Sequence, residues 1–275
     1  MIKNHKSVSG FALSLLILTA IPFRVSAQNR PGTPPAPVDA KTEAVINHAV
    51  EALGGSNYLN VKTTVGRGFF TAFQDGMSQL PARFVDYISY PDHERTEFVS
   101  LGIRVIQTNN GETGWVFDGA TKTLGDLKAP QVAAFKRSMR TSVENLLFGW
   151  WKKDGATLSY VGRREAGVGK RNETIRLTYP DGFWIEYEFG ARDGLPAKVI
   201  YKRTQKKADT DETVELNEED RMGKLITVQG ITAAWVVDHY INGVQSSRIS
   251  YESLEYNQPL PDSFFAKPAN IKALK

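Results

Sequence analysis

The sequence predicts a mainly β protein of the α+β class, with a curled antiparallel sheet of about eleven strands and helices covering its concave face. Short runs rich in β-branched and aromatic residues follow one another from Lys62 onward, and turn residues separate them roughly every 8–12 positions. Two other segments place apolar residues three or four positions apart, which is typical of amphipathic helices. Antiparallel sheets of this size tend to curl, so these two helices are expected to fill the concave face.

The first predicted helix begins after Asp39, which can cap it, and ends at Gly54 and Gly55. The second lies within residues 129–155 and has Pro130 in its first turn. Its cationic residues are on the side opposite to an unusually bulky apolar stripe, which consists of Val132, Phe135, Met139, Val143, Leu146, Leu147 and Trp150. We expect one long helix here, acting as a lid on the sheet.

Strand patterns account for most of the remaining chain. In the segment 183–190, Ile185, Tyr187 and Phe189 alternate with Trp184, Glu186 and Glu188, so one face is apolar and the other is charged. The highly charged segment 206–221 is interpreted as a solvated hairpin or loop, and residues 259–272 as irregular. Further strands are expected at 63–73, 82–90, 95–102, 104–109, 115–117, 157–167, 170–179, 196–204, 224–230, 234–243 and 248–257.

The N-terminal segment has the pattern of a secretory signal peptide over residues 1–27. Lys3 and Lys6 precede the apolar run 10–21, and a small-x-small motif ends at Ala27. A retained membrane anchor is the alternative. Residues 28–38 are proline-rich and predict a linker, followed by a single domain over 39–275. The expected location is therefore the periplasm.

Charge and composition exclude several classes of function. Removal of residues 1–27 takes away three cations and no acid, so the net charge falls from +4 to +1, and a nucleic-acid-binding face is not expected. The chain has no cysteine, which excludes disulfides, thiolate metal sites and a cysteine nucleophile. His48, His93 and His239 lack the spacing of metal ligands, so we expect no metal and no cofactor.

Two pairs of acids are candidates for catalysis. Glu186 and Glu188 lie two positions apart on one strand and could form the carboxylate pair of an enzyme that acts on envelope polysaccharide. A solvent-facing strand explains the same residues. Glu112 and Asp118 are explained as turn residues beside Asn-Gly and Asp-Gly sequences. We expect a protein that is not an enzyme, with the polysaccharide enzyme and a protein-binding envelope scaffold as alternatives.

Three segments occur in an order that resembles the LolA-like family of periplasmic outer-membrane lipoprotein carriers: YISYPDHERTEF at 87–98, NNGETGWVFDG at 109–119 and PDSFFAKPANIK at 261–272. The resemblance implies a half-open antiparallel barrel with helices as a lid. It also implies binding of lipoprotein acyl chains, of other apolar ligands or of envelope-stress signals. Carriers of this family have a basic residue before the corner proline, whereas this chain has Tyr90.

The predicted function is that of a periplasmic carrier or sensor with a hydrophobic groove. Its expected partners are an acylated lipoprotein or lipid and, in addition, an envelope protein; membrane contact is expected to be transient and the protein a monomer. Lid movement would release the ligand. The aromatic and lid residues expected to line the groove are Phe84, Phe98, Trp115, Phe117, Phe135, Met139, Leu146, Trp150, Trp184 and Trp235.

Overall fold

The computed structural model describes residues 38–207, 210 and 212–274. The predicted signal peptide and residues 28–37 of the predicted linker lie outside this range. Within it, no helix is long and apolar enough to cross a membrane.

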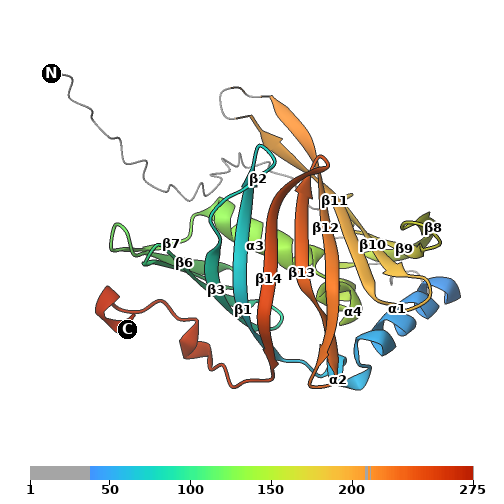
Figure 1. The fold of residues 1–275 in the computed structure, drawn as a ribbon, viewed down its shortest axis with the longest axis horizontal. Coiled ribbons are helices and arrows are strands. Elements are labelled where there is room, and N and C mark those ends of the chain that lie inside the picture. Colours follow the sequence, from blue (N-terminus) through green and yellow to red (C-terminus); the bar gives the residue numbers. More distant parts are fainter. Residues whose placement is uncertain (1–37, 208–209, 211, 275) are drawn as a thin grey trace.

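The fold is built on an antiparallel sheet of fourteen strands, which curls around two consecutive helices (Figure 1). The spatial order runs β7-β6-β5-β4-β3-β1-β14-β13-β12-β11-β10-β9-β8, and β2 pairs only with β1. The strands are β1 (Thr63–Gln74), β2 (Met77–Ser78), β3 (Ala82–Ser89), β4 (His93–Ser100), β5 (Ile103–Asn110), β6 (Thr113–Asp118), β7 (Thr123–Asp126), β8 (Thr157–Glu165), β9 (Arg171–Thr178), β10 (Trp184–Gly190), β11 (Pro196–Lys206), β12 (Thr213–Val228), β13 (Ile231–Ile241) and β14 (Val244–Tyr256). The predicted curled antiparallel sheet is confirmed, with fourteen strands in place of about eleven.

The charged segment 206–221 was expected to be a solvated hairpin or loop, and it belongs to the hairpin in which β11 pairs antiparallel with β12. Residues from Thr213 onward form the first half of β12, which pairs with β11. The charges are tolerated because they pair across the two strands: Lys202 Nζ lies 2.6 Å from Glu215, and Lys198 Nζ lies 3.3 Å from Glu219. Cross-strand ion pairs stabilise a strand whose composition alone suggests a solvated loop.

The first helix, α1 (Ala40–Leu53), has the predicted boundaries. The Asp39 side chain accepts hydrogen bonds from the backbone of Lys41 and Thr42, and Gly54 ends the helix with a φ of 123°. A single turn, α2 (Ser56–Leu59), follows and packs against β13.

The second predicted helix is broken into three parts, α3 (Ala129–Thr141), α4 (Val143–Leu147) and the 3-10 turn η1 (Trp150–Asp154). Ser142 has an extended backbone, and its hydroxyl accepts a hydrogen bond from the Asn145 N–H at 3.0 Å, so it ends α3 and caps α4. Gly149 has a φ of +75° and ends α4. Helical periodicity persists through both breaks, which is why the sequence pattern predicts one continuous helix.

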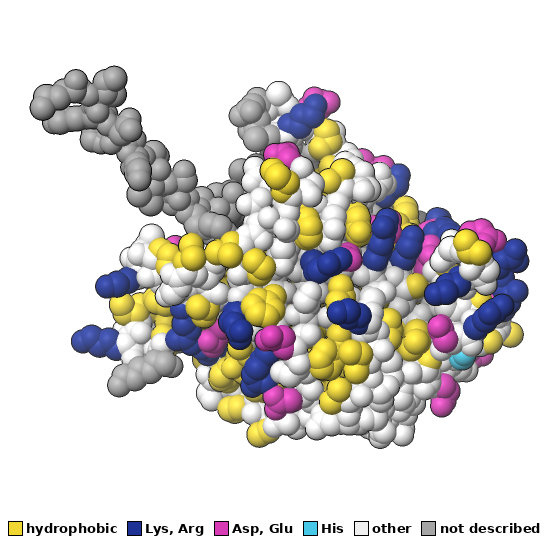
Figure 2. All heavy atoms as spheres, viewed as in Figure 1, with side chains coloured by type: hydrophobic (Ala, Val, Ile, Leu, Met, Phe, Trp, Pro, Cys, Tyr) yellow, Lys and Arg dark blue, Asp and Glu magenta, His cyan; other side chains and the backbone are white. Residues whose placement is uncertain are grey.

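Alternate residues of each strand face either the helices or the outside. In β10 the alternation is confirmed: Ile185, Tyr187 and Phe189 are at most 1% exposed and belong to the main hydrophobic core. The core continues through α1, α4 and the concave side of the sheet. Figure 2 shows that, on one face of the exterior, hydrophobic side chains are interspersed with charged ones.

The C-terminal segment runs along the outer face of β3 to β6, at the lower left in Figure 1. The indole N–H of Trp115 donates to the Phe265 carbonyl at 2.9 Å, and the guanidinium of Arg104 donates to the Leu274 carbonyl at 2.8 Å. The ring centroids of Tyr87 and Phe264 lie 4.8 Å apart. The segment therefore covers part of the outer face of this half of the sheet, including Trp115.

Candidate functional site

A cavity of about 480 Å³ lies between the concave face of the sheet and the helices α3 and α4. Its volume is within the range of small-molecule sites in proteins. Strands β11 to β14 form an apolar wall, with α2 and α4 opposite. The apolar lining includes Leu53, Val61, Val143, Val199, Met222, Ile231, Val237, Ile249 and Leu254.

One part of the cavity is a cluster of aromatic rings around an acid. Phe148 lies 5.1 Å from Tyr58 and 5.8 Å from Tyr90, measured between ring centroids, and Trp150 packs on both Tyr90 and Phe148. Glu144, the second residue of α4, lines the cavity in this cluster. Because α4 packs on the core through Val143, Leu146 and Leu147, its first turn holds Glu144 over the cavity.

Burial raises the pKa of Glu144, and among the described residues no Lys, Arg or His side chain pairs with its carboxyl group. Two further polar atoms in the cavity lack partners. The hydroxyl groups of Tyr58 and Tyr256 are buried and have no hydrogen-bond partner in the described part of the chain. Burial and then the nearby Glu144 charge raise the pKa of Tyr58 well above its usual range and that of Tyr256 to about 12. These three groups line the same cavity, and we call them its polar pole.

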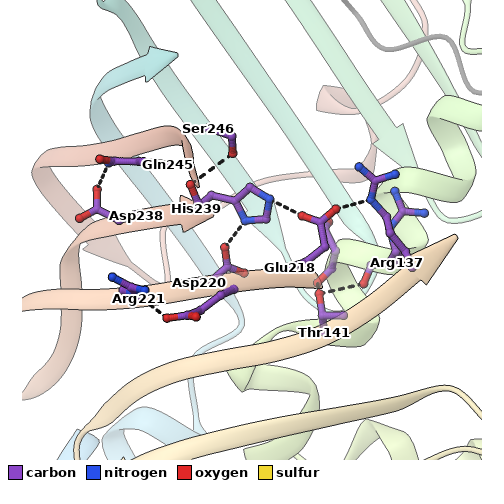
Figure 3. A network of polar contacts seen from close by, with 12 residues as sticks. Arg137, Thr141, Glu218, Asp220, Arg221, Asp238, His239, Gln245 and Ser246 are labelled. Carbon is purple, nitrogen blue, oxygen red and sulfur yellow. Dashed lines mark hydrogen bonds and ion pairs between the residues drawn. The ribbon is translucent and has the colours of Figure 1, made fainter. Parts of the chain in front are cut away.

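His239, near the end of β13, belongs to a second polar group in the cavity lining. Figure 3 shows the imidazole of His239 between two carboxylates: its Nε2 lies 2.5 Å from Glu218 and its Nδ1 lies 2.6 Å from Asp220. Arg203 donates to the other oxygen of Glu218. Burial alone would lower the pKa of His239, but the hydrogen bonds to Asp220 and Glu218 outweigh it and raise the pKa to about 9.

The two carboxylates occupy both ring nitrogens of His239, so neither nitrogen is free to bind another group. In the part of the chain that the structure describes, no group of three or more His, Asp or Glu side chains is arranged to hold a metal ion. The His239 cluster is a neutralised charge network that stabilises β11, β12 and β13.

A larger, open cleft of about 990 Å³ runs along α3. Cations and acids alternate along its walls, and several pair directly: Lys136 with Glu112, and Arg140 with Asp181 at 2.9 Å. An apolar ligand gains little from such a surface, because the charged groups would lose water. The smaller cavity is thus the better candidate for an apolar ligand.

The ten predicted groove residues are divided between the inside and the outside of the sheet, and none of them is among the residues that line the 480 Å³ cavity. Those on the inner side border it. Phe84 packs on Tyr251, and Phe98 packs on Phe84. Trp150 packs on Tyr90, while Leu146 and Trp235 are part of the core or its periphery. Phe135 and Met139 line the open cleft.

Three of the ten predicted residues are on the outer face. Trp115 is 2% exposed beneath the C-terminal segment, and Phe117, two positions along β6, shares its face. Trp184 packs against the guanidinium of Arg176, whose carbon lies 4.7 Å from its ring centroid. Strand alternation separates the two faces but does not say which is concave, so the sequence assigned these residues to the wrong side. The ligand-binding roles of the ten residues stay a prediction.

Glu186 and Glu188 are also on the outer face, opposite Ile185 and Tyr187. Arg164 pairs with both carboxylates, at 2.6 and 3.1 Å, and Arg176 pairs with Glu186 at 2.5 Å. Each acid is thus held by arginine in a structural ion-pair ladder across β8, β9 and β10. This arrangement favours the structural explanation of the pair.

No protein-family model and no curated protein matches the chain. Solved structures do match. A DUF1329 family protein from Desulfovibrio piger is 15% identical, with a TM-score of 0.56, and the match covers 85% of this chain and 99% of that one. A putative outer membrane lipoprotein-sorting protein domain from Vibrio parahaemolyticus is 9% identical, with a TM-score of 0.54 over 82% and 97% of the two chains.

A LolA superfamily protein from Nitrosomonas europaea matches with 13% identity and a TM-score of 0.50, over 82% of this chain and 97% of that one. Identities at this level show the fold alone. In all three comparisons the match extends over nearly the whole of the solved chain, so the likeness concerns the complete sheet and its helices. This chain therefore has the LolA-like fold that its sequence motifs predict.

Proposed function

We propose that the protein is a non-catalytic periplasmic carrier or sensor that binds an acyl chain, of a lipoprotein or of another amphiphile, in the cavity between the sheet and α3–α4. The observation that carries this proposal is the apolar lining of the cavity, to which the neighbouring strands β11 to β14 and residues of α1, α2 and α4 contribute. Burial of apolar surface is favourable by about 25 cal/mol per Å², so a preformed apolar cavity suits an alkyl chain.

The break in the predicted lid helix supports release of such a ligand. Ser142 and Gly149 divide the helical segment into three short parts, and movement of α4 changes the wall of the cavity without unfolding α3. The expected partners are an acylated lipoprotein or lipid and an envelope protein that receives it. Contact with a membrane is expected only during transfer, and the protein is expected to be a monomer.

A cavity-filling substitution tests the proposal. Ala233 lines the cavity on β13, and Ala233→Phe should reduce binding of an uncharged fluorescent fatty-alcohol probe at least tenfold, because the new ring takes the place of the alkyl chain. Ala120→Phe is the matched control, since Ala120 is exposed in the turn after β6, and it should bind like the wild type. Lipid that co-purifies with the wild type and is absent from Ala233→Phe, measured by native mass spectrometry, would support the proposal. Wild-type protein that binds no probe and carries no lipid would contradict it.

A further inference from the structure

The polar pole of the cavity is an unusual feature for a site that takes only an alkyl chain. A buried acid without a cation costs free energy, as does each buried hydroxyl without a partner. Tyr58 and Tyr256 each have an unpartnered hydroxyl in the cavity lining, and the Glu144 charge acts on both tyrosines. Such groups are expected where a ligand supplies the missing partners.

The complementary chemistry is that of a primary ammonium group. An ammonium group has three N–H donors and no acceptor. The pole offers it three acceptors, which are the carboxylate of Glu144 and the hydroxyl oxygens of Tyr58 and Tyr256. The faces of the rings around the pole, Phe148 and Tyr90 among them, add an attraction for a cation.

An anionic head is disfavoured by the same residues. Among the described residues that line the cavity, His239 is the only cation, and both of its ring nitrogens are already bound to Glu218 and Asp220. A carboxylate or phosphate head would therefore find no free cation beside His239. Beside Tyr58 and Tyr256 it would be repelled by the carboxylate of Glu144.

We propose that the cavity selects a single-chain amphiphile with a primary ammonium head, which Glu144, Tyr58 and Tyr256 bind while the alkyl chain lies along the apolar wall. This inference rests on the proposed function and specifies its ligand class. It assigns the cavity to cationic amphiphiles and not to free fatty acids.

The test compares three probes that share one alkyl chain: dodecylamine, dodecanol and dodecanoate, titrated calorimetrically at pH 8 below their micelle concentrations. Dodecylamine is protonated at this pH, as a lysine amine is. Wild-type protein should bind dodecylamine at least tenfold more tightly than either of the other probes. Glu144→Gln should remove this preference, reducing the affinity for dodecylamine about tenfold while changing that for dodecanol by less than twofold.

Glu51→Gln is the matched control, because Glu51 is an exposed acid on α1 and its removal changes the net charge by the same amount. If Glu144→Gln does not fold, as judged by circular dichroism, the double variant Tyr58→Phe/Tyr256→Phe gives the same comparison, since it removes only two hydroxyl oxygens. The control should keep the full preference for dodecylamine.

The outcomes separate this inference from the proposed function. Equal binding of the three probes, blocked in each case by Ala233→Phe, would overturn the inferred selection of an ammonium head. It would leave the proposed acyl-chain cavity in place. Water would then be the hydrogen-bond partner of Glu144, Tyr58 and Tyr256. Preference for dodecanoate would overturn the inference as well. Binding of none of the probes would overturn both proposals.

Discussion

His239 and Glu144, which both line the cavity, show opposite ways of placing a charge in a largely apolar interior. Every polar atom of the His239 ring has a partner, since Glu218 and Asp220 bind its two nitrogens. Glu144 lines the same cavity without a cation beside it among the described residues. A buried ion is tolerated when it is paired and hydrogen-bonded, and otherwise tends to lose its charge. The difference indicates that the first group belongs to the folded framework, whereas the second is available to a ligand.

Removal of His239 should have the largest effect on stability. His239→Asn leaves Glu218 and Asp220 without their imidazolium, and breaking a buried ion pair in this way costs roughly 3–5 kcal/mol. We expect the free energy of unfolding, measured with urea at pH 7, to fall by about that amount. A loss below about 1 kcal/mol would mean that the His239 cluster is not the framework we describe.

The pH dependence of the same cluster gives a second, smaller effect. Because the pKa of His239 is about 9 in the folded protein and about 6.5 when unfolded, its contribution is complete below pH 6.5 and is lost as the pH rises through 9. Unfolding measured from pH 6 to 10 should show a decrease of roughly 2–3 kcal/mol. The decrease should be absent from His239→Asn, and its persistence there would assign it to other groups.

Glu144→Gln should change stability in the opposite direction. Since burial raises the pKa of Glu144 in the folded state, the ionised form reduces stability, and this cost appears as the pH rises above the value of the unfolded carboxyl. At pH 5 the variant should match the wild type, and at pH 8 it should be more stable by up to about 1–2 kcal/mol. A less stable variant at pH 8 would show that Glu144 has a structural partner after all.

The sequence predicted the framework better than it predicted this site. The curled sheet and its helices were predicted from strand alternation, from the Asp39 cap and from the corner and strand motifs. These features could be recognised because backbone preferences and periodicity depend on residues that are neighbours in the sequence. Glu144 lies in the predicted lid helix on the same side as Arg137 and Arg140, and Tyr90 lies where carriers of the family have a basic residue; both turned out to line the cavity.

Other parts of the site could not be obtained from local patterns. Tyr58, Tyr90 and Tyr256 come from α2, from the turn between β3 and β4, and from the end of β14, and only the sheet order brings them together. Trp115 was assigned to the interior because periodicity does not reveal that residues 259–274, far along the chain, cover part of the outer face.

The two tyrosine hydroxyls should have the smallest effect on stability and yet a clear effect on binding. Tyr58→Phe/Tyr256→Phe removes two buried hydroxyls that have no partner among the described residues. The free energy of unfolding of this double variant should therefore stay within about 1 kcal/mol of the wild type or exceed it. By contrast, Tyr160→Phe removes a hydroxyl that donates to Glu173 at 2.5 Å, and this variant should lose about 1.5–3 kcal/mol of its free energy of unfolding. If the double variant keeps its stability but loses about tenfold in affinity for dodecylamine, the hydroxyls serve the ligand and not the fold. A large loss of stability would instead place them, like His239, in the framework.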